Sequence, residues 1–168
     1  MEKEKFYLLI AGSRKFGPND RFKFSNEYLT TNVICETVCS AMLKKQIELG
    51  REIHIVHGDA RGADTVGKIY GIKKGYEIDA FPASWGMFGR AAGHIRNAEM
   101  YQFLREQEHK GALLFWDGES RGTKNNFYQA YRYRVPIKCF LYLQERFMTE
   151  EEIRAVYEEC LEEMQRQR

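Results

Sequence analysis

Short apolar segments alternate with segments of helical periodicity along the chain, and this alternation constrains the fold more than any other feature. The first apolar segment, residues 6–11, is continuously hydrophobic and ends at Gly12, which is typical of a strand buried on both faces. Strand-like segments follow at residues 53–57, 77–81, 112–116 and 137–142. Helical spacing occurs at residues 32–49, 62–74, 91–108, 123–133 and from 149 onward. This order predicts an α/β fold with a parallel sheet covered by helices on both faces.

The charge distribution divides the chain into a basic body and an acidic tail. The chain has 168 residues, which suits one domain, and a net charge of +2. Residues 1–143 carry 22 basic and 16 acidic residues, whereas residues 144–168 carry four basic and eight acidic ones. Thr149 and Glu152 have capping-box spacing, so the tail is predicted to be an amphipathic helix. We expect it to pack on the sheet domain or at an interface, and a homodimer is one expectation.

Several classes of protein are not indicated by the composition. No apolar run approaches the roughly 20 residues of a membrane span, so no membrane partner is expected. The charged N-terminus does not resemble a signal peptide, and the four cysteines suit reduced thiols. Cys35 and Cys39 have no matching ligand pair, so neither a metal site nor a cofactor is predicted. The sequence therefore predicts a cytoplasmic location.

The turn after the first predicted strand carries Gly12, Ser13 and Arg14. A glycine and a small hydroxyl let the backbone approach a ligand, and an arginine can bind a phosphate in a fork. The stretch that follows, residues 15–31, is too long for a tight turn. A lid over a ligand and an added hydrophobic flap are both open for it.

The turn after the second strand is bracketed by Gly58 and Gly62 and leads into a helix. The free N–H groups of such a turn can face an anion, although glycines at this junction are also common turn formers. Asp64, at the start of the helix, either caps it or binds a sugar hydroxyl.

The segment after the third strand, residues 89–97, places small residues at the start of a helix. Gly93 lies three and four residues before Arg96 and Asn97, so the three share one helical face. An Arg-Asn pair beside small residues suits recognition of a phosphate, a base or a ribose; a surface arginine with a packing glycine is the alternative. Trp85 either stacks on a ligand ring or belongs to the core.

The turn after the fourth strand contains Asp117, Gly118, Ser120, Gly122 and Thr123. This polar, glycine-bracketed turn leads into a helix N-terminus, which is again an arrangement suited to anions. Thr123 either offers its hydroxyl to a ligand or caps the helix. Because the carboxyl ends of parallel strands share one edge of a sheet, these turns are predicted to meet at one ligand site.

Taken together and in order, these motifs resemble those of the YspA, cpYpsA-related branch of the SLOG superfamily. The resemblance covers roughly residues 6–142 and includes Ala92-Gly93, residues 96–100 and Trp116 through Thr123. It implies a Rossmann-like three-layer sandwich with a mainly parallel five-stranded sheet in the order 3-2-1-4-5, and a nucleotide-derived ligand at the switch point. Relatives include lysine-decarboxylase-like phosphoribohydrolases and the single-strand-binding DprA proteins.

One departure from the phosphoribohydrolase pattern bears on catalysis. In those relatives a Gly-Thr-x-x-Glu motif supplies the glutamate that acts at the ribose, whereas here Gly122-Thr123 is followed by an amide, Asn126, at that position. An amide cannot act as a general base. The remaining carboxylate candidates are Asp64, Asp117 and Glu119.

The leading hypothesis is therefore a protein that binds a nucleotide-derived, phosphate-bearing small molecule, as a sensor or a sequestering protein. The sequence assigns ligand binding to Gly12, Ser13, Arg14, Gly58, Gly62, Asp64, Gly93, Arg96, Asn97, Asp117, Gly118, Ser120, Gly122 and Thr123. N-glycosidic hydrolysis of such a ligand is the alternative. Binding of single-stranded nucleic acid ranks third, because a basic body allows it but no strong basic patch is evident.

Overall fold

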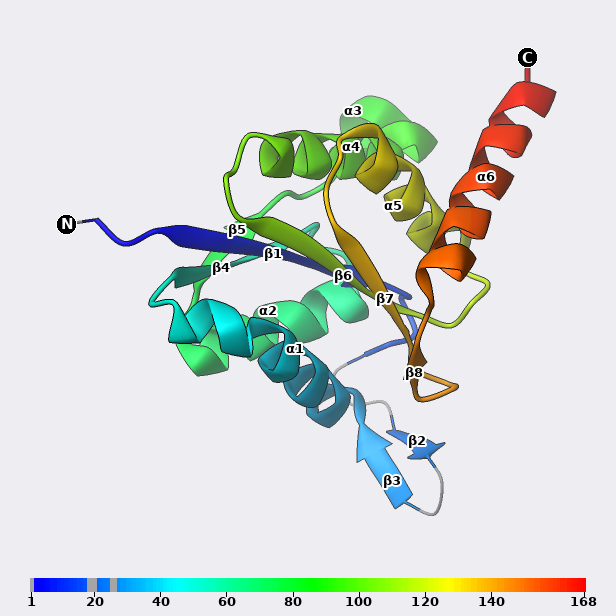
Figure 1. Cartoon of the computed structure of the whole chain (residues 1–168). Coiled ribbons are helices and arrows are strands. Elements are labelled where there is room, and N and C mark those ends of the chain that lie inside the picture. The colour runs from blue at the N-terminus through cyan, green and yellow to red at the C-terminus, as the bar shows by residue number, and fades with distance from the viewer. Residues whose placement is uncertain (1, 18–20, 25–26) are drawn as a thin grey trace.

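The structure, a computed structural model, describes residues 2–17, 21–24 and 27–168. Its main feature is a six-stranded sheet in the order β5-β4-β1-β6-β7-β8 (Figure 1). The parallel strands are β1 (Lys5–Gly12), β4 (Glu52–His57), β5 (Glu77–Ala80), β6 (Lys110–Trp116) and β7 (Ile137–Leu141). In chain order these five strands follow 3-2-1-4-5, so the predicted Rossmann-like arrangement is confirmed.

Helices cover both faces of this sheet, as the alternation predicts. One face is covered by α1 (Thr31–Glu48) and α2 (Ala63–Lys74), and the other by α4 (Ala92–Arg105) and α5 (Arg121–Arg132) (Figure 1). The short α3 (Trp85–Phe88) and a 3-10 turn, η1 (Gly89–Ala91), precede α4. The core accordingly has two layers, one on each side of buried β1 and β6.

Two glycines that weaken the sequence-based prediction of α2 have a packing role. A Cβ atom at Gly67 would lie 2.6 Å from Ile10, and one at Gly71 would lie 2.6 Å from Ile78. Helix α2 therefore lies so close to the sheet that only glycine fits at these two positions. This close packing fixes the position of the turn at the start of the helix.

Two β elements were not predicted. A short strand, β8 (Arg146–Phe147), pairs antiparallel with β7, and the segment before α1 contains a hairpin of β2 (Arg21–Phe24) and β3 (Glu27–Thr30). Figure 1 shows the hairpin projecting from the body beyond α1. The stretch for which a lid and a hydrophobic flap were both open, residues 15–31, includes positions 18–20 and 25–26, which lie outside the described residues.

The acidic tail forms α6 (Glu150–Arg166), which packs on α5 through the stacked rings of Tyr157 and Tyr131, 4.4 Å apart. Its capping box is present: the Thr149 hydroxyl accepts a bond from the Glu152 amide, and the Glu152 carboxylate accepts one from the Thr149 amide. Among the described residues, no helix has the length and apolar character that crossing a membrane requires.

Candidate ligand-binding site

A cavity of about 440 Å³ opens at the carboxyl ends of β1, β4 and β6, where the sequence predicts a ligand site. This volume lies within the range of about 300–1,000 Å³ that is usual for small-molecule sites. Its walls come from the turns after those strands and from α3, α4 and α5. The lining residues are Ala11, Gly12, Arg14, Lys15, Ala60, Arg61, Asp64, Trp85, Arg90, Gly93, His94, Arg96, Asn97, Ser120, Gly122, Thr123 and Asn126.

Ser13 ties three of these turns together. Its hydroxyl accepts a hydrogen bond from the Asp117 amide at 3.0 Å and lies 3.3 Å from the Ser120 hydroxyl. Its carbonyl oxygen accepts a bond from the Ala63 amide at 3.1 Å. Ser13 is fully buried and is not among the lining residues, so its contacts are with the protein itself.

Gly12, at the end of β1, is required by close packing. It has a φ of +147°, and a Cβ atom here would lie 2.0 Å from the carbonyl oxygen of Phe115. A side chain at this position would therefore separate β1 from β6 at the floor of the cavity.

The carboxylate of Asp64 occupies the turn after β4. Asp64 is 4% exposed, and its Oδ2 accepts a hydrogen bond from the Gly58 amide at 2.7 Å. Burial raises the pKa of Asp64 to about 6, although the charge of Arg96 and the amides of Gly58 and Ala60 lower it. The amide groups of this turn, which the sequence assigns to an anion, are thus already bonded to an anion of the protein.

Arg96 holds the same turn from α4. Its Nη1 donates to the carbonyl oxygen of Gly58, and its Nε donates to Oδ1 of Asn97 at 2.9 Å. Asn97 in turn donates to Asn125 at 3.1 Å. Burial lowers the pKa of Arg96, and the charge of Asp64 raises it. A Cβ atom at Gly58 would lie 2.4 Å from Nη1 of Arg96, so a side chain at this position would displace the guanidinium.

Asp117 orders the turn after β6. Its Oδ1 accepts bonds from the amides of Glu119 and Ser120, each at 2.9 Å, and its Oδ2 accepts one from the Ser120 hydroxyl at 2.7 Å. Although burial raises the pKa of Asp117, these bonds outweigh burial and lower it overall. Asp117 and Glu119 do not line the cavity, and neither does Gly118, whose φ is +90°.

The N-terminus of α5 opens onto the cavity without a side-chain cap. The Ser120 hydroxyl donates to Asp117 and makes no cap bond to the helix. Gly122 and Thr123, in the first turn, both line the cavity, and a Cβ atom at Gly122 would meet no atom within 4 Å. Thr123 is only 2% exposed, and its buried Oγ1 atom has no hydrogen-bond partner among the described residues. A buried hydroxyl without a partner, at a helix N-terminus, suits an anionic ligand.

Asn126, one turn further along α5, presents an amide to the cavity. Its Oδ1 accepts a hydrogen bond from the buried Tyr101 hydroxyl at 2.9 Å, so its amide nitrogen remains available as a donor. The position at which the resembled hydrolases carry a glutamate is therefore a hydrogen-bond donor here.

Among the described residues, five cationic side chains and one carboxylate line this cavity. Arg14, Lys15, Arg61 and Arg90 are exposed at its rim, and Arg96 is half-buried. That carboxylate, Asp64, accepts from the amides of the turn and interacts with the charge of Arg96. An anionic ligand is the chemical class that such a cavity favours.

Of the residues assigned from the sequence, nine line the cavity: Gly12, Arg14, Asp64, Gly93, Arg96, Asn97, Ser120, Gly122 and Thr123. Gly58 and Gly62 belong to the turn after β4 but do not line the cavity, and Gly62 has a φ of +85°. The sequence-based assignment did not include Lys15, Arg90 and His94. The spacing of Arg90 and His94, four residues apart in the segment already singled out, could have indicated them.

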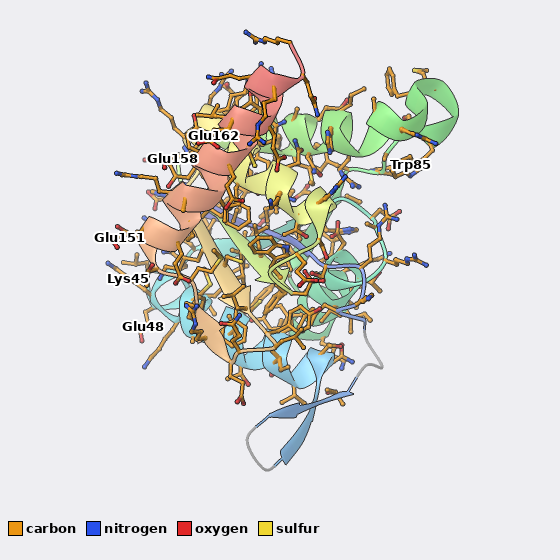
Figure 2. All side chains as sticks on the ribbon, turned by 90° about the vertical axis from the view of Figure 1, so that its right-hand side faces the viewer. Lys45, Glu48, Trp85, Glu151, Glu158 and Glu162 are labelled. Atoms are coloured by element: carbon orange, nitrogen blue, oxygen red, sulfur yellow. The ribbon has the colours of Figure 1, made fainter. Side chains whose placement is uncertain are left out.

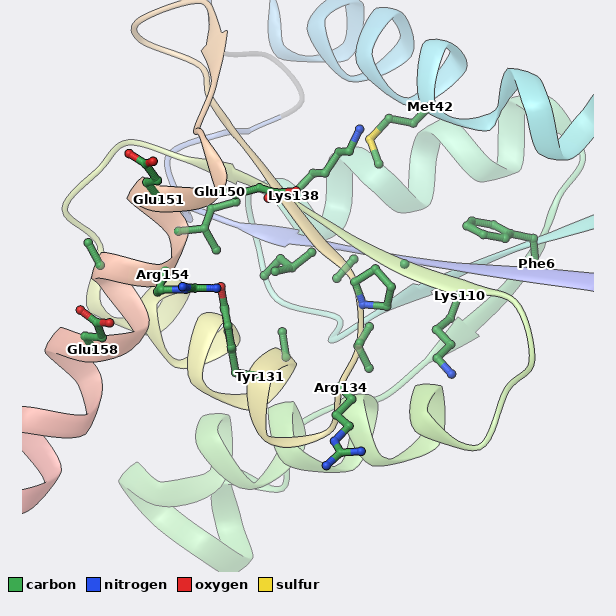
Figure 3. Close-up of a pocket in the computed structure, with 18 of the residues that line it drawn as sticks. Phe6, Met42, Lys110, Tyr131, Arg134, Lys138, Glu150, Glu151, Arg154 and Glu158 are labelled. Carbon is green, nitrogen blue, oxygen red and sulfur yellow. The ribbon is translucent and has the colours of Figure 1, made fainter.

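A second, larger cavity of about 1030 Å³ lies at the opposite ends of β6 and β7, between α6, the end of α5 and Met42 of α1 (Figure 3). Its charged side chains are mixed, with Lys138 and Arg154 beside Glu150 and Glu158. In the described part of the chain, no side chain with an unpartnered buried polar atom lines it. The smaller cavity is therefore the better candidate site.

Comparisons with known proteins add nothing to this site. No family model matches the chain, no curated protein matches its sequence, and no solved structure matches its fold. Within the described residues there is no cluster of histidine, cysteine and acidic side chains that could hold a metal ion.

Proposed function

We propose that the chain binds a nucleotide-derived small molecule whose phosphate group lies at the N-terminus of α5. The observation that carries the proposal is Thr123, a lining residue of the cavity whose buried Oγ1 atom lacks a hydrogen-bond partner among the described residues. A phosphate oxygen would accept its hydrogen bond and those of the first-turn amides, and it would meet the positive end of the helix dipole. The protein would act as a sensor or a sequestering protein.

The charges around the cavity support a phosphate rather than a neutral group. Arg14 and Arg61 come from two different turns, so they can approach one phosphate from two sides. Asn126 adds a neutral donor from α5. The one carboxylate that lines the cavity within the described part of the chain, Asp64, accepts a hydrogen bond from the Gly58 amide and lies in the positive field of Arg96.

Titration calorimetry and thermal shift against nucleoside monophosphates, ADP-ribose species and dinucleotides test this proposal. We expect binding below millimolar Kd, weakened roughly 10- to 100-fold by Thr123→Val, because a hydrogen bond to a charged group is worth about 1.5–3 kcal/mol. Arg14→Ala should weaken binding as well, whereas Arg166→Ala, on the exposed end of α6, should not. No binding in the whole panel, or equal binding by Thr123→Val and the wild type, would refute it.

N-glycosidic hydrolysis is a second candidate function, and one observation favours it. Asp64 lines the cavity with a pKa raised to about 6 by burial, near the range that suits an acid–base group. Release of free base from bound nucleotides, abolished by Asp64→Asn, would support it. Intact nucleotides after prolonged incubation at high protein concentration would argue against it.

The family, the cellular location and the oligomeric state are also proposed, on the basis of the sequence. Membership of the YspA, cpYpsA-related branch of the SLOG superfamily rests on the ordered motifs between Gly12 and Thr123. A cytoplasmic homodimer is proposed with it. Light scattering coupled to gel filtration tests the homodimer: a mass of about twice the 19.8 kDa chain supports it, and a monomer mass rejects it.

A further inference from the structure

We propose that Trp85 forms a base subsite of this cavity, so that the ligand is a nucleotide whose aromatic base stacks on the Trp85 indole. This inference rests on the proposed function, in which the phosphate of the ligand lies at α5. It assigns an aromatic base to the other end of that ligand and Trp85 as the residue that binds the base.

The exposure of Trp85 is the first observation. Trp85 is 51% exposed, whereas the other tryptophan of the chain, Trp116, is 3% exposed and packs against Phe127. The sequence left open whether Trp85 belongs to the core, and its exposure shows that it does not. Figure 2 shows Trp85 on α3, at the margin of the molecule away from α6. A large half-exposed ring at the mouth of a pocket offers an apolar surface for a ligand.

The position of the indole against α4 is the second observation. A Cβ atom at Gly93 would lie 3.5 Å from Cη2 of Trp85, so the edge of the ring lies close to the backbone of α4. Arg90 and His94 line the cavity on the same segment. The site therefore combines a stacking surface with donors that can reach the edge of a base.

The third observation separates Trp85 from its apolar neighbours. Met87 and Phe88 lie on the same short helix and are 77% and 43% exposed, yet only Trp85 of the three lines the cavity. Trp85 and Thr123 are lining residues of the same cavity of about 440 Å³, one on α3 and the other on α5. One small ligand can therefore contact both ends.

The experiment compares two probes that share a phosphate and differ in the base. The Kd values of ribose 5-phosphate and of the four nucleoside monophosphates are measured for the wild type, Trp85→Ala and Trp85→Phe. Stacking of one base corresponds to a factor of about 5- to 150-fold in affinity. We expect the wild type to bind at least one nucleoside monophosphate tighter than ribose 5-phosphate by such a factor. Trp85→Ala should reduce that ratio to about one, and Trp85→Phe should retain most of it.

A matched control and an independent readout accompany these titrations. Met87→Ala removes an exposed apolar side chain from the same helix but none from the cavity, so the ratio should stay at its wild-type value. A base that stacks on Trp85 should quench the tryptophan fluorescence of the wild type. Because the other tryptophan, Trp116, is buried and a base cannot stack on it, this quenching should disappear in Trp85→Phe.

The outcomes distinguish this inference from the function on which it rests. If ribose 5-phosphate and nucleotides bind but Trp85→Ala leaves their ratio unchanged, the base subsite is refuted while phosphate binding stands. If no phosphate compound binds the wild type, the proposed function fails and the base subsite fails with it. Equal binding of both probes by the wild type would likewise refute the subsite alone.

Discussion

The clearest quantitative prediction concerns Asp64, because its carboxylate is buried and titrates within an accessible pH range. Its pKa is raised from 3.8 to about 6 by burial. Between these two values the folded protein binds more protons than the unfolded chain, so the free energy of unfolding falls as the pH rises. At 1.36 kcal/mol per pKa unit, the full loss from below pH 3 to above pH 7 is about 3 kcal/mol, of which about 2 kcal/mol occurs between pH 4 and pH 7. Asp64→Asn removes this titration and keeps an oxygen that can accept from the Gly58 amide.

Urea denaturation of the wild type and Asp64→Asn across this pH range isolates the effect. Between pH 4 and pH 7 the wild-type free energy of unfolding should fall by about 2 kcal/mol relative to that of the variant, with most of the change below about pH 6. Asp59→Asn controls for the loss of one carboxylate from the same turn, because Asp59 is exposed. The carboxyl resonance of Asp64 should titrate near pH 6 in the folded protein.

A difference between wild type and Asp64→Asn that does not change with pH would refute this reasoning. It would mean that the amides and Arg96 stabilise the ionised carboxylate enough to offset its burial. A change of the opposite sign, with the wild type gaining stability as the pH rises, would show that they more than offset it.

Two further predictions concern the packing of the sheet and the tail helix. Gly12→Ala should destabilise the fold by on the order of 3 kcal/mol in urea denaturation, because its Cβ atom would lie 2.0 Å from the Phe115 carbonyl oxygen, whereas Gly122→Ala, in open space, should stay within about 0.5 kcal/mol. Thr149→Ala should cost about 1 kcal/mol, because it removes the capping box with Glu152; an unchanged urea midpoint would contradict this.

The sequence was sufficient for the parallel part of the fold because strand and helix periodicities are local properties. The five strands and their parallel arrangement follow from the alternation, whereas their order was expected from the resemblance to a known family. The strand β8 and the hairpin of β2 and β3 were not predictable in this way. The strand β8 has only two residues, and the hairpin before α1 occurs in a segment for which a lid and a flap were both open.

The location of the candidate site was predictable from the sequence. Which of its polar groups remain free to bind a ligand was not. Strand ends brought Arg14, Arg96 and Thr123 to one cavity, as the sequence indicated. Which polar groups remain available depends on contacts between distant side chains. The Asp64 carboxylate accepts from the Gly58 amide, so it occupies the turn after β4. The Ser120 hydroxyl donates to Asp117 and makes no cap bond to α5. No spacing rule in a single sequence contains that information.

The carboxylate that fills the turn after β4 has a consequence for competition between ligands. Asp64 lies in the first turn of α2, six residues after the Gly58 whose amide it accepts from, so its effective concentration at that position far exceeds that of any dissolved phosphate. A ligand with several phosphates therefore competes there against a covalently tethered anion. The amides of the turn after β4 are thereby unavailable to a second phosphate group, which would depend on exposed cations at the rim of the cavity such as Arg14 and Arg61.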